Sequence, residues 1–397
     1  MIGNQNIPKL RFPGFDGEWE NSVLNKFASL NPKNSSLPES FVYIDLESVT
    51  DGHLIKENII SKNEAPSRAQ RILKEKDILY QTVRPYQKNN LYFNKVGQYV
   101  ASTGYAQIRT KNDSKFLFHF LHTEKFVANV MLRCTGTSYP AINSTDLSNI
   151  EISFPTLPEQ QKIASFLSAV DEKIQQLSRK KELLEQYKKG VMQQLFSGKL
   201  RFKDENGKDY PDWEEKKLGD LGVFKGGGTP STEISEYWNG NIPWISSSDL
   251  IENDILNINV TRYITDKAIS ESATKLIPVN SVLFISRVGV GKLAVSKRTM
   301  CTSQDFANFI PSEINPFYLA YYFIKNNNLL ASYAQGTSIK GFTSADLKSI
   351  KVSYPIPEEQ QKIANFLSSI DAKIDNTKDE LEKIQLFKKG LLQKMFV

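Results

Sequence analysis

Apolar residues recur in alternating steps of four and three along residues 159–196 and again along residues 359–396. A 3.5-residue period kept over about five heptads is typical of a left-handed coiled coil. We therefore predict two long helices, each roughly 55 Å long at 1.5 Å per residue, that pack against each other. Two ordinary core helices are the alternative. The apolar positions that define this seam are Ile163, Leu167, Val170, Ile174, Leu177, Leu184, Ile363, Leu367, Ile370, Ile374, Leu381 and Ile384.

Polar residues interrupt the seam at equivalent places, with Lys188 in the first helix and Lys388 in the second. A buried polar seam residue fixes helix register at some cost in stability. Prolines precede both helices, as is common at a first helical turn, and Gly198 is a suitable stop for the first helix. These signals place the helices at 158–199 and 358–397.

The two halves of the chain repeat each other at an offset of 200 residues. The segment Glu159-Gln160-Gln161-Lys162-Ile163-Ala164 returns from Glu359 to Ala364. The alignment runs without a gap from Gly136-Thr137-Ser138 against Gly336-Thr337-Ser338 to Phe196 against Phe396, and nearly half of its positions are identical. Since the residues between the repeats differ widely, the sequence indicates one duplicated scaffold that carries two different domains.

The variable regions, residues 1–157 and 200–357, have the pattern of α+β domains. Short strand-like runs at 41–44, 77–80 and 281–285 are bounded by Gly, Pro, Asn and Ser. One helix in each half, near 116–132 and 316–333, is predicted to lead into the Gly-Thr-Ser repeat.

Composition narrows the class of protein. The chain has 397 residues, 40% hydrophobic and 24% charged, which is ordinary for a globular protein of two or three domains. A net charge of +6 permits a polyanionic partner without requiring one. Cys134 and Cys301 are far apart, which suits a reducing compartment. With no signal peptide and no long apolar run, we expect a cytoplasmic protein without a membrane segment.

Three motifs suggest catalysis, and each has a plainer interpretation. Phe224-Lys225-Gly226-Gly227-Gly228 fits a methyltransferase cofactor loop and Asn315-Pro316-Phe317 resembles a catalytic motif of those enzymes, but no βαβ pattern surrounds them. Pro211-Asp212 before Glu214-Glu215-Lys216 suggests a nuclease metal site, although a polar loop before a helix is favoured. His119 and His122 share a helical spacing, and a surface pair is favoured over a metal site. We therefore predict no catalytic, cofactor or metal residue in this chain.

Two loops have the composition of a DNA-binding surface. Each follows a predicted strand, 77–80 in the first half and 282–284 in the second. Arg, Lys and Asn among glycines and aromatic residues are the types that contact base edges and phosphates, and a solvated loop is the equally weighted alternative. The candidate DNA-binding residues are Arg84, Tyr86, Lys88, Asn89, Arg287 and Lys292.

The repeated motifs resemble a known family. The segment 157–167 with Asp171-x-Lys173-Ile174 is similar to the conserved helical region of type I restriction-modification specificity subunits. Leu10-Arg11-Phe12-Pro13-Gly14-Phe15 with Trp19, echoed by Leu200-Arg201-Phe202 with Trp213, resembles the opening of their target recognition domains. Gly227-Gly228-Thr229-Pro230 and Ile242-Pro243-Trp244-Ile245 match a run common in such domains, which the first half lacks. The first domain is therefore expected to belong to a different recognition subtype.

The resemblance implies a fold, a function and partners. The implied fold is α+β, with two target recognition domains (1–157 and 200–357) and two long helices that form an antiparallel coiled coil with pseudo-two-fold symmetry. Each domain would read half of a bipartite sequence in double-stranded DNA, and the helices would set the gap. The implied partners are two modification (methyltransferase) subunits and restriction (translocase/endonuclease) subunits, which would carry S-adenosylmethionine, ATP and Mg²⁺. The chain itself would be non-catalytic. A stand-alone DNA methyltransferase or nuclease, and a coiled-coil adaptor without DNA contact, remain as alternatives.

Overall fold

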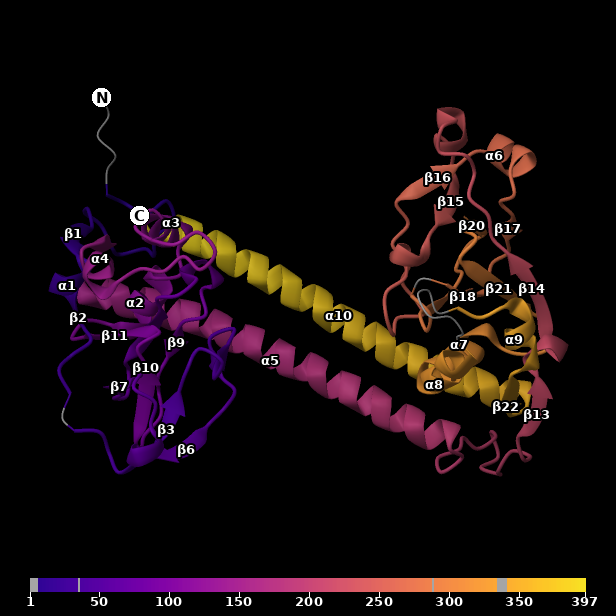
Figure 1. Cartoon of the computed structure of the whole chain (residues 1–397), viewed down its shortest axis with the longest axis horizontal. Helices are drawn as coiled ribbons and strands as arrows, with labels where there is room; N and C mark the ends of the chain where they lie inside the picture. The colour runs from indigo at the N-terminus through magenta and orange to yellow at the C-terminus, as the bar shows by residue number, and fades with distance from the viewer. Residues whose placement is uncertain (1–5, 35, 288, 334–340) are drawn as a thin grey trace. The chain divides into compact units, whose positions relative to one another are not determined.

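The computed structural model describes residues 6–34, 36–287, 289–333 and 341–397. The chain divides into two compact units (Figure 1). Unit 1 consists of Met1–Ser178 together with Asp379–Val397, and unit 2 consists of Arg179–Lys378. Each unit therefore contains one variable region and parts of both long helices.

In its described residues, unit 1 holds two four-stranded sheets and two two-stranded sheets, one of which pairs β4 with β5. The first sheet has the order β6-β3-β10-β7, the second β2-β11-β8-β9, and β1 pairs with β12. Within the first sheet β10 runs parallel to β3 and antiparallel to β7. The strands are β1 Glu20–Val23, β2 Ala28–Leu30, β3 Ser40–Ile44, β4 Val49–Thr50, β5 His53–Leu54, β6 Asn58–Ser61, β7 Ala69–Ile72, β8 Ile78–Gln81, β9 Leu91–Tyr92, β10 Tyr99–Ser102, β11 Tyr105–Thr110 and β12 Glu151–Phe154.

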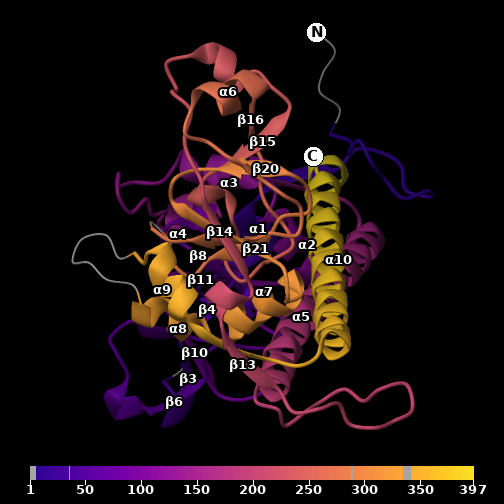
Figure 2. The ribbon, with the colours of Figure 1, turned by 90° about the vertical axis from the view of Figure 1, so that its right-hand side faces the viewer.

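Unit 2 repeats this topology with different residues. Its sheets have the orders β16-β15-β20-β17 and β14-β21-β18-β19, and β13 pairs with β22. The parallel pair recurs as β15 with β20. Figures 1 and 2 show the sheet with β15 and β20 lying between α6 and the sheet with β14 and β21. The strands are β13 Glu214–Lys217, β14 Gly222–Gly226, β15 Ile242–Ile245, β16 Arg262–Ile264, β17 Leu276–Ile277, β18 Val282–Ile285, β19 Leu293–Val295, β20 Met300–Thr302, β21 Phe306–Pro311 and β22 Lys351–Tyr354.

The two long helices form where the heptad pattern predicts them. α5 spans Leu157–Phe196 and α10 spans Pro357–Met395. α5 ends two residues before Gly198, whose φ of +72° ends the helix in a left-handed conformation that glycine adopts without strain. The shorter helices are α1 Leu24–Phe27, α2 Ser114–Phe120, α3 Glu124–Met131, α4 Ser144–Ser148, α6 Asp266–Glu271, α7 Pro316–Lys325, α8 Asn327–Tyr333 and α9 Ser344–Ser349.

The seam packs antiparallel inside each unit. In unit 1, Ile163 and Leu167 near the start of α5 share a buried cluster with Leu391 and Met395 near the end of α10. Unit 2 has the reverse arrangement, in which the start of α10 packs with the end of α5. The predicted antiparallel pairing is thus confirmed within each unit. Of the seam residues, Ile163, Leu167, Val170, Leu177, Ile363, Leu367 and Ile370 are buried, and Ile174, Leu184, Ile374, Leu381 and Ile384 are half-buried.

Two salt bridges join the helices at the polar seam positions. Lys388 Nζ lies 2.5 Å from Asp171 Oδ1 in unit 1, and Lys188 Nζ lies 2.5 Å from Asp371 Oδ1 in unit 2. A lysine stem packs along apolar neighbours while its ammonium group meets a carboxylate, so the lysine is accommodated in the seam. The polar interruption is therefore itself part of the duplicated scaffold.

The Glu-Gln-Gln repeat fastens each variable domain to its helix. Arg11 forms two hydrogen bonds to the Glu159 carboxylate, at 2.8 and 2.7 Å, and Arg201 binds Glu359 in the same way. Paired bonds between a guanidinium and a carboxylate are short, directional and charge-assisted. We call these two contacts the arginine clamps. Glu159 and Glu359 are buried, so the clamps also neutralise two carboxylates that would otherwise lie unpaired in the interior.

The glutamine that follows each of these glutamates binds the residue that caps the start of an earlier helix, α2 in unit 1 and α7 in unit 2. Gln160 Oε1 accepts a hydrogen bond from the backbone N–H of Asp113, and Gln360 Oε1 accepts one from Asn315. Both glutamines also donate to the carbonyl of the proline five residues earlier. The Glu-Gln pair at the start of each Glu-Gln-Gln repeat therefore has a structural role, because it binds the variable domain to the long helix.

Three expectations need correction. The helix predicted near 116–132 is two helices, because the Thr123 hydroxyl accepts from the backbone N–H of Phe126 and caps a new helix start. The stretch near 316–333 is likewise divided, into α7 and α8. Glu214–Lys217 is a strand rather than a loop before a helix, since it pairs with β22. The predicted strands at 41–44, 77–80 and 281–285 are confirmed within one residue, and Gly336-Thr337-Ser338 lie outside the described residues.

Candidate nucleic-acid interface

The predicted loop of unit 1 follows β8 and contains a short 3₁₀ helix, η2 (Pro85–Gln87). Arg84 and Lys88 flank it with φ of 53° and 54°. Non-glycine residues in this left-handed region carry strain, so surrounding contacts must hold the backbone there. Such contacts are present: the Asn90 carboxamide accepts from the backbone N–H of Gln81 at 2.8 Å, and the Gln81 side chain donates to Gln87 Oε1 at 3.0 Å. The loop is a fixed structure.

The candidate residues of this loop differ in availability. Tyr86 is about half exposed, at 49%. The Arg84 guanidinium lies over the ring of Tyr139, 4.2 Å from the ring centroid. Lys88 forms a salt bridge with Glu124 at 3.0 Å. Tyr86 and Arg84 thus present an aromatic and a polar group at the surface. Lys88 would have to leave Glu124 before it could bind a phosphate.

Asn89 has a structural role that accounts for its amide. Its Nδ2 donates to the carbonyl of Val49 at 2.6 Å, and its Oδ1 accepts from the backbone N–H of Gly52. Both ends of the carboxamide therefore tie the loop to the turn between β4 and β5. Composition alone could not separate this asparagine from one that reads a base, because the distinction depends on the remote residues at 49 and 52.

The loop of unit 2 occupies the equivalent place by a different route. It joins β18 to β19 through Gly289 and Gly291, at φ of 100° and 105°. Arg287 is exposed, and Lys292 is half-buried with its Nζ 3.3 Å from the carbonyl of Leu250. Glycine adopts a positive φ without strain, so this loop needs no 3₁₀ helix or strained non-glycine residue to turn. The two loops therefore present different surfaces from corresponding strands.

Backbone contacts show that Arg84 and Arg287 do not hold matching positions. The N–H of Ile142 donates to the carbonyl of Thr82, and that of Phe342 donates to the carbonyl of Ser286. Thr82 and Ser286 are therefore equivalent. Arg84 lies two residues after Thr82, whereas Arg287 lies one residue after Ser286.

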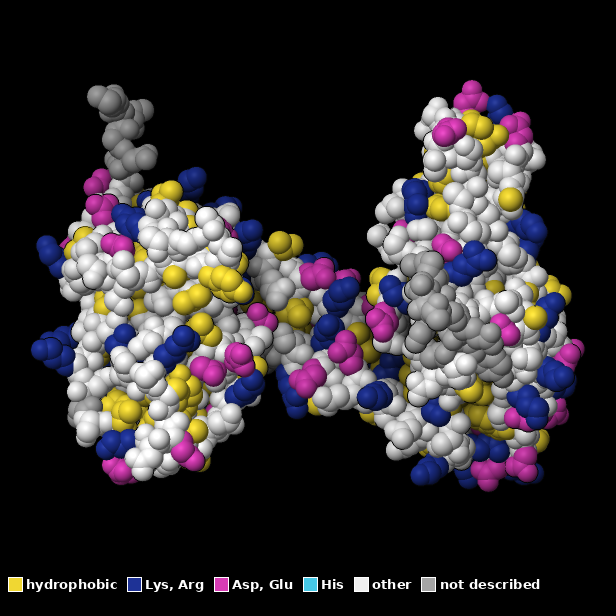
Figure 3. Space-filling model, in the orientation of Figure 1, with side chains coloured by type: hydrophobic (Ala, Val, Ile, Leu, Met, Phe, Trp, Pro, Cys, Tyr) yellow, Lys and Arg dark blue, Asp and Glu magenta, His cyan; other side chains and the backbone are white. Residues whose placement is uncertain are grey.

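Charge on the surface does not by itself mark an interface. On the face that Figure 3 shows, Lys and Arg side chains are scattered among Asp and Glu in both units. Two exposed aromatic side chains belong to the Arg84 loop or contact it, namely Tyr86 at 49% and Tyr139 at 64% exposure. Exposed aromatic groups beside a guanidinium are typical of binding surfaces.

The histidine pair is a packing feature of unit 1. His119 is 2% exposed and His122 is half-buried, so the predicted surface pair was wrong. Burial lowers the pKa of His122 to about 4 and that of His119 well below its ordinary range. His122 Nδ1 lies 2.7 Å from the carbonyl of Phe118. Across the described ranges, three or more His, Cys, Asp or Glu residues nowhere gather as a metal site would require.

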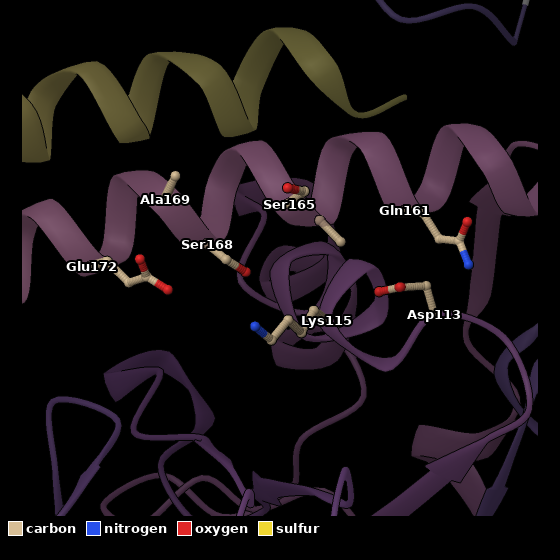
Figure 4. A pocket seen from close by; sticks show the side chains of 8 residues that line it. Asp113, Lys115, Gln161, Ser165, Ser168, Ala169 and Glu172 are labelled. Atoms are coloured by element: carbon tan, nitrogen blue, oxygen red, sulfur yellow. The ribbon is translucent and has the colours of Figure 1, made fainter.

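A hollow of about 350 Å³ lies between α2 and α5 in unit 1 (Figure 4). Charged side chains of both signs line it, namely Lys115, Asp113 and Glu172, together with small α5 side chains such as Ser165 and Ser168. Charges of both signs on an open surface do not define a cofactor, and we assign none to it.

Comparison with known sequences and structures gives the family. The profile of the type I restriction modification DNA specificity domain matches residues 18–186 and, a second time, residues 210–386. The chain belongs to this family. The two matches cover most of both halves, in agreement with the duplicated topology of the two units.

Similar sequences carry related names. The chain is 38% identical to the type I restriction enzyme MjaIX specificity subunit of Methanocaldococcus jannaschii over 199 residues, which is 48% of this chain and 46% of that protein. It is 36% identical to the Escherichia coli EcoR124I/EcoR124II specificity subunit, over 40% of this chain and 41% of that one. It thus aligns with about half the length of these relatives. A third, the MjaVIII specificity subunit, is 27% identical over 89% of this chain and 84% of its own length.

Solved structures of this family show the same fold. The crystal structure of the type I restriction-modification system S subunit from M. genitalium matches with a TM-score of 0.67 at 18% identity, over 98% of this chain and 99% of that one. A chain from a study of complex assembly and conformational transition of the type I R-M system matches with a TM-score of 0.57 at 23% identity, over the same share of each. Together with the packing within each unit, this confirms the predicted fold class.

The suspected methyltransferase motifs have structural roles in this specificity domain. A Cβ on Gly227 would lie 2.1 Å from the carbonyl oxygen of Ser303, and one on Gly228 would lie 2.5 Å from the backbone of Ala273. Glycine is required there for close packing. Asn315 caps α7 by accepting from the backbone N–H groups of Phe317 and Tyr318.

None of the helices in the described ranges combines the length and apolar character that a membrane crossing needs.

Proposed function

We propose that the chain is the DNA-recognition subunit of a type I restriction-modification complex and reads a bipartite target, one half in each unit. The observation that carries the proposal is the contrast between a repeated scaffold and two unlike loops. The strand pairing, the arginine clamps and the helix salt bridges recur in both units, whereas the loops after β8 and β18 differ in length, backbone and side chains. Unlike loops on like scaffolds are suited to reading unlike sequences.

The long helices are proposed to set the gap between the two half-sites. α5 has 40 residues, which at 1.5 Å per residue is roughly 60 Å of continuous helix. It starts in the buried cluster of unit 1 and ends in that of unit 2. A stiff helix anchored in two cores is a suitable spacer, because it transmits a fixed length rather than a range of lengths.

Partner subunits are part of the same proposal. We expect two modification subunits to dock on the helices and to supply S-adenosylmethionine and the methyl transfer, and restriction subunits to supply the ATP- and Mg²⁺-dependent steps. Tyr187 and Phe387 hold equivalent positions on α5 and α10 and are 52% and 50% exposed. Aromatic residues exposed at the same place in both repeats are the groups that such a subunit would cover. A non-catalytic role and a cytoplasmic location for this chain belong to the proposal as well.

Methylation mapping tests the proposal. The chain, reconstituted with its modification subunit and S-adenosylmethionine, is expected to methylate adenines only within a two-part motif separated by a fixed number of unspecified bases. The chain alone, given S-adenosylmethionine or Mg²⁺, is expected to leave DNA unmodified and uncut. Methylation or cleavage by the purified chain would instead support the stand-alone enzyme. Failure of the complex to bind DNA would support the adaptor.

A further inference from the structure

Most residues that the two halves share have a visible structural role. The shared glutamates belong to the arginine clamps, and the shared glutamines bind the backbone of Asp113 and Asn315. The shared apolar residues form the seam. One exposed shared group lies beside the candidate interface. Gly136-Thr137-Ser138, repeated in the sequence as residues 336–338, lies at the surface of unit 1, where both Thr137 and Ser138 are exposed. Packing does not explain why these side chains are the same in both halves.

The segment is a rigid loop. Thr135 and Ala141 exchange two backbone hydrogen bonds of 2.9 Å, which close the five residues between them. Gly136 allows this closure with a φ of +88°. The loop is also bound directly to the Arg84 loop, since the N–H of Arg84 donates to the carbonyl of Pro140 at 2.7 Å. The exposed hydroxyls of Thr137 and Ser138 are thereby held in place beside the candidate interface.

Tyr139 connects the shared loop to the variable one. Its ring supports the Arg84 guanidinium at 4.2 Å, and it remains 64% exposed. A guanidinium over an aromatic ring gains a cation–π attraction and keeps its N–H donors in its own plane. Arg84 Nε is buried and has no hydrogen-bond partner among the described residues, so outward bonds of Arg84 would come from its terminal nitrogens. Two hydroxyl groups, an aromatic ring and a guanidinium therefore lie on one short stretch of surface.

The Gly-Thr-Ser sequence is the same in both halves, whereas the loops after β8 and β18 differ. A repeated group of this kind is suited to binding the part of a ligand that is the same at both half-sites. The two units carry unlike loops, so the bases that they would meet also differ. The sugar–phosphate backbone is the same at both half-sites, and Ser and Thr hydroxyls commonly donate to phosphate oxygens. Resting on the proposed function, we infer that Thr137 and Ser138 bind the DNA backbone and set the position of the first unit on the duplex. Tyr139 acts as a positioning residue for Arg84.

The double substitution Thr137→Val with Ser138→Ala, made in the full chain and assembled with the modification subunits, tests this inference. Affinity is measured on a duplex that contains the methylated motif and on a duplex of random sequence. Loss of two hydrogen bonds to phosphate is expected to weaken binding about tenfold on both duplexes alike. Because neither residue is charged, the dependence of affinity on salt should not change. The mapped methylation motif should also stay the same.

A matched control is Ser36→Ala with Ser67→Ala, which removes two exposed hydroxyls on other loops of unit 1. It should bind both duplexes as the unsubstituted complex does. Three results would overturn the inference: unchanged affinity in the Thr137/Ser138 variant, relaxed reading of a single base position, or loss of modification subunits before DNA is added. The last would assign the loop to a protein contact. If the unsubstituted complex fails to bind DNA at all, the proposed function fails first, and the two failures are distinguishable.

Discussion

Among the residues that the structure describes, the two units share the contacts that fasten each domain to the long helices, and they differ in the loops that follow β8 and β18. Arg11 with Glu159 in unit 1 corresponds to Arg201 with Glu359 in unit 2, down to paired hydrogen bonds of similar length. After the equivalent strands β8 and β18, however, one unit forms a 3₁₀ helix and the other forms a glycine turn. The scaffold is therefore specified by a small set of repeated contacts, and the sheets tolerate unlike loops at the same edge.

A second contrast concerns the side chains that lie beside Asp171 of α5 and Asp371 of α10. Asp371 of unit 2 accepts from the Tyr321 hydroxyl at 2.7 Å as well as meeting Lys188. In unit 1, Asp171 has His119 Nδ1 at 3.8 Å and meets Lys388. Both aromatic residues follow a helix cap that bonds to the shared glutamine. A tyrosine in one unit and a histidine in the other give equivalent positions different responses to pH.

Breaking an arginine clamp should have the largest effect. Arg11→Ala leaves the Glu159 carboxylate, 2% exposed, without its cation. Removal of one partner of a buried ion pair typically costs about 3–5 kcal/mol. Arg201→Ala should cost a similar amount in unit 2, as measured by urea unfolding. A loss below about 1 kcal/mol in either variant would show that the clamp is dispensable.

Substitution of the loop arginines should separate the units functionally. Arg84→Ala is expected to weaken binding to the target by about 1–3 kcal/mol and to relax one position of the first half-site only, if the guanidinium reads a base. If it binds phosphate, affinity should fall evenly and the salt slope should drop by about one. Arg287→Ala should act only on the second half-site. Unchanged affinity, salt slope and methylation motif would remove these loops from the interface.

Acid should destabilise unit 1 and spare unit 2. All three histidines of the chain, at 53, 119 and 122, belong to unit 1. A folded-state pKa of about 4 for His122 against 6.5 when unfolded means that the unfolded state binds the extra proton first. Stability is thus complete above pH 6.5 and falls as the pH drops toward 4.

The loss from His122 alone is about 2 kcal/mol at pH 5. Hydrogen exchange at pH 7 and pH 5, corrected for intrinsic rates, should show protection lost selectively in unit 1, and His122→Gln should reduce the difference. Equal loss in both units would contradict the assignment.

The smallest expected difference lies between the seam lysines. Lys188 and Asp371 are 12% and 13% exposed, whereas Lys388 and Asp171 are 24% and 33% exposed. Lys188→Met should therefore destabilise the chain more than Lys388→Met, which we expect to cost less than about 1 kcal/mol because exposed pairs contribute little. Thermal unfolding of the two variants side by side measures the difference. The reverse order would show that burial does not control these pairs.

Sequence alone predicts the features that depend on local periodicity. The seam and the ends of α5 follow from the heptads and from Gly198, and the strands near 77 and 282 follow from short apolar runs. The DNA-binding role of Arg84, Tyr86, Lys88, Asn89, Arg287 and Lys292 stays a prediction.

Features that depend on distant partners escape such reasoning. Glu159 meets Arg11 across 148 residues, Asn89 is bound by a turn near residue 49, and His119 is buried beside Asp171 of α5. The break between α2 and α3 was missed because Thr123 caps a new helix inside a continuous apolar pattern.

The central claim is that one duplicated scaffold spaces two independent readers. Insertion of seven residues after Leu177 and after Thr377, matched positions at the middle of each helix, keeps the heptad and adds roughly 10 Å, or about three base pairs of B-DNA. Methylation mapping of the assembled variant should return both half-sites unchanged with a gap longer by about three bases. An active variant with an unchanged gap, or with altered half-sites, would contradict the account.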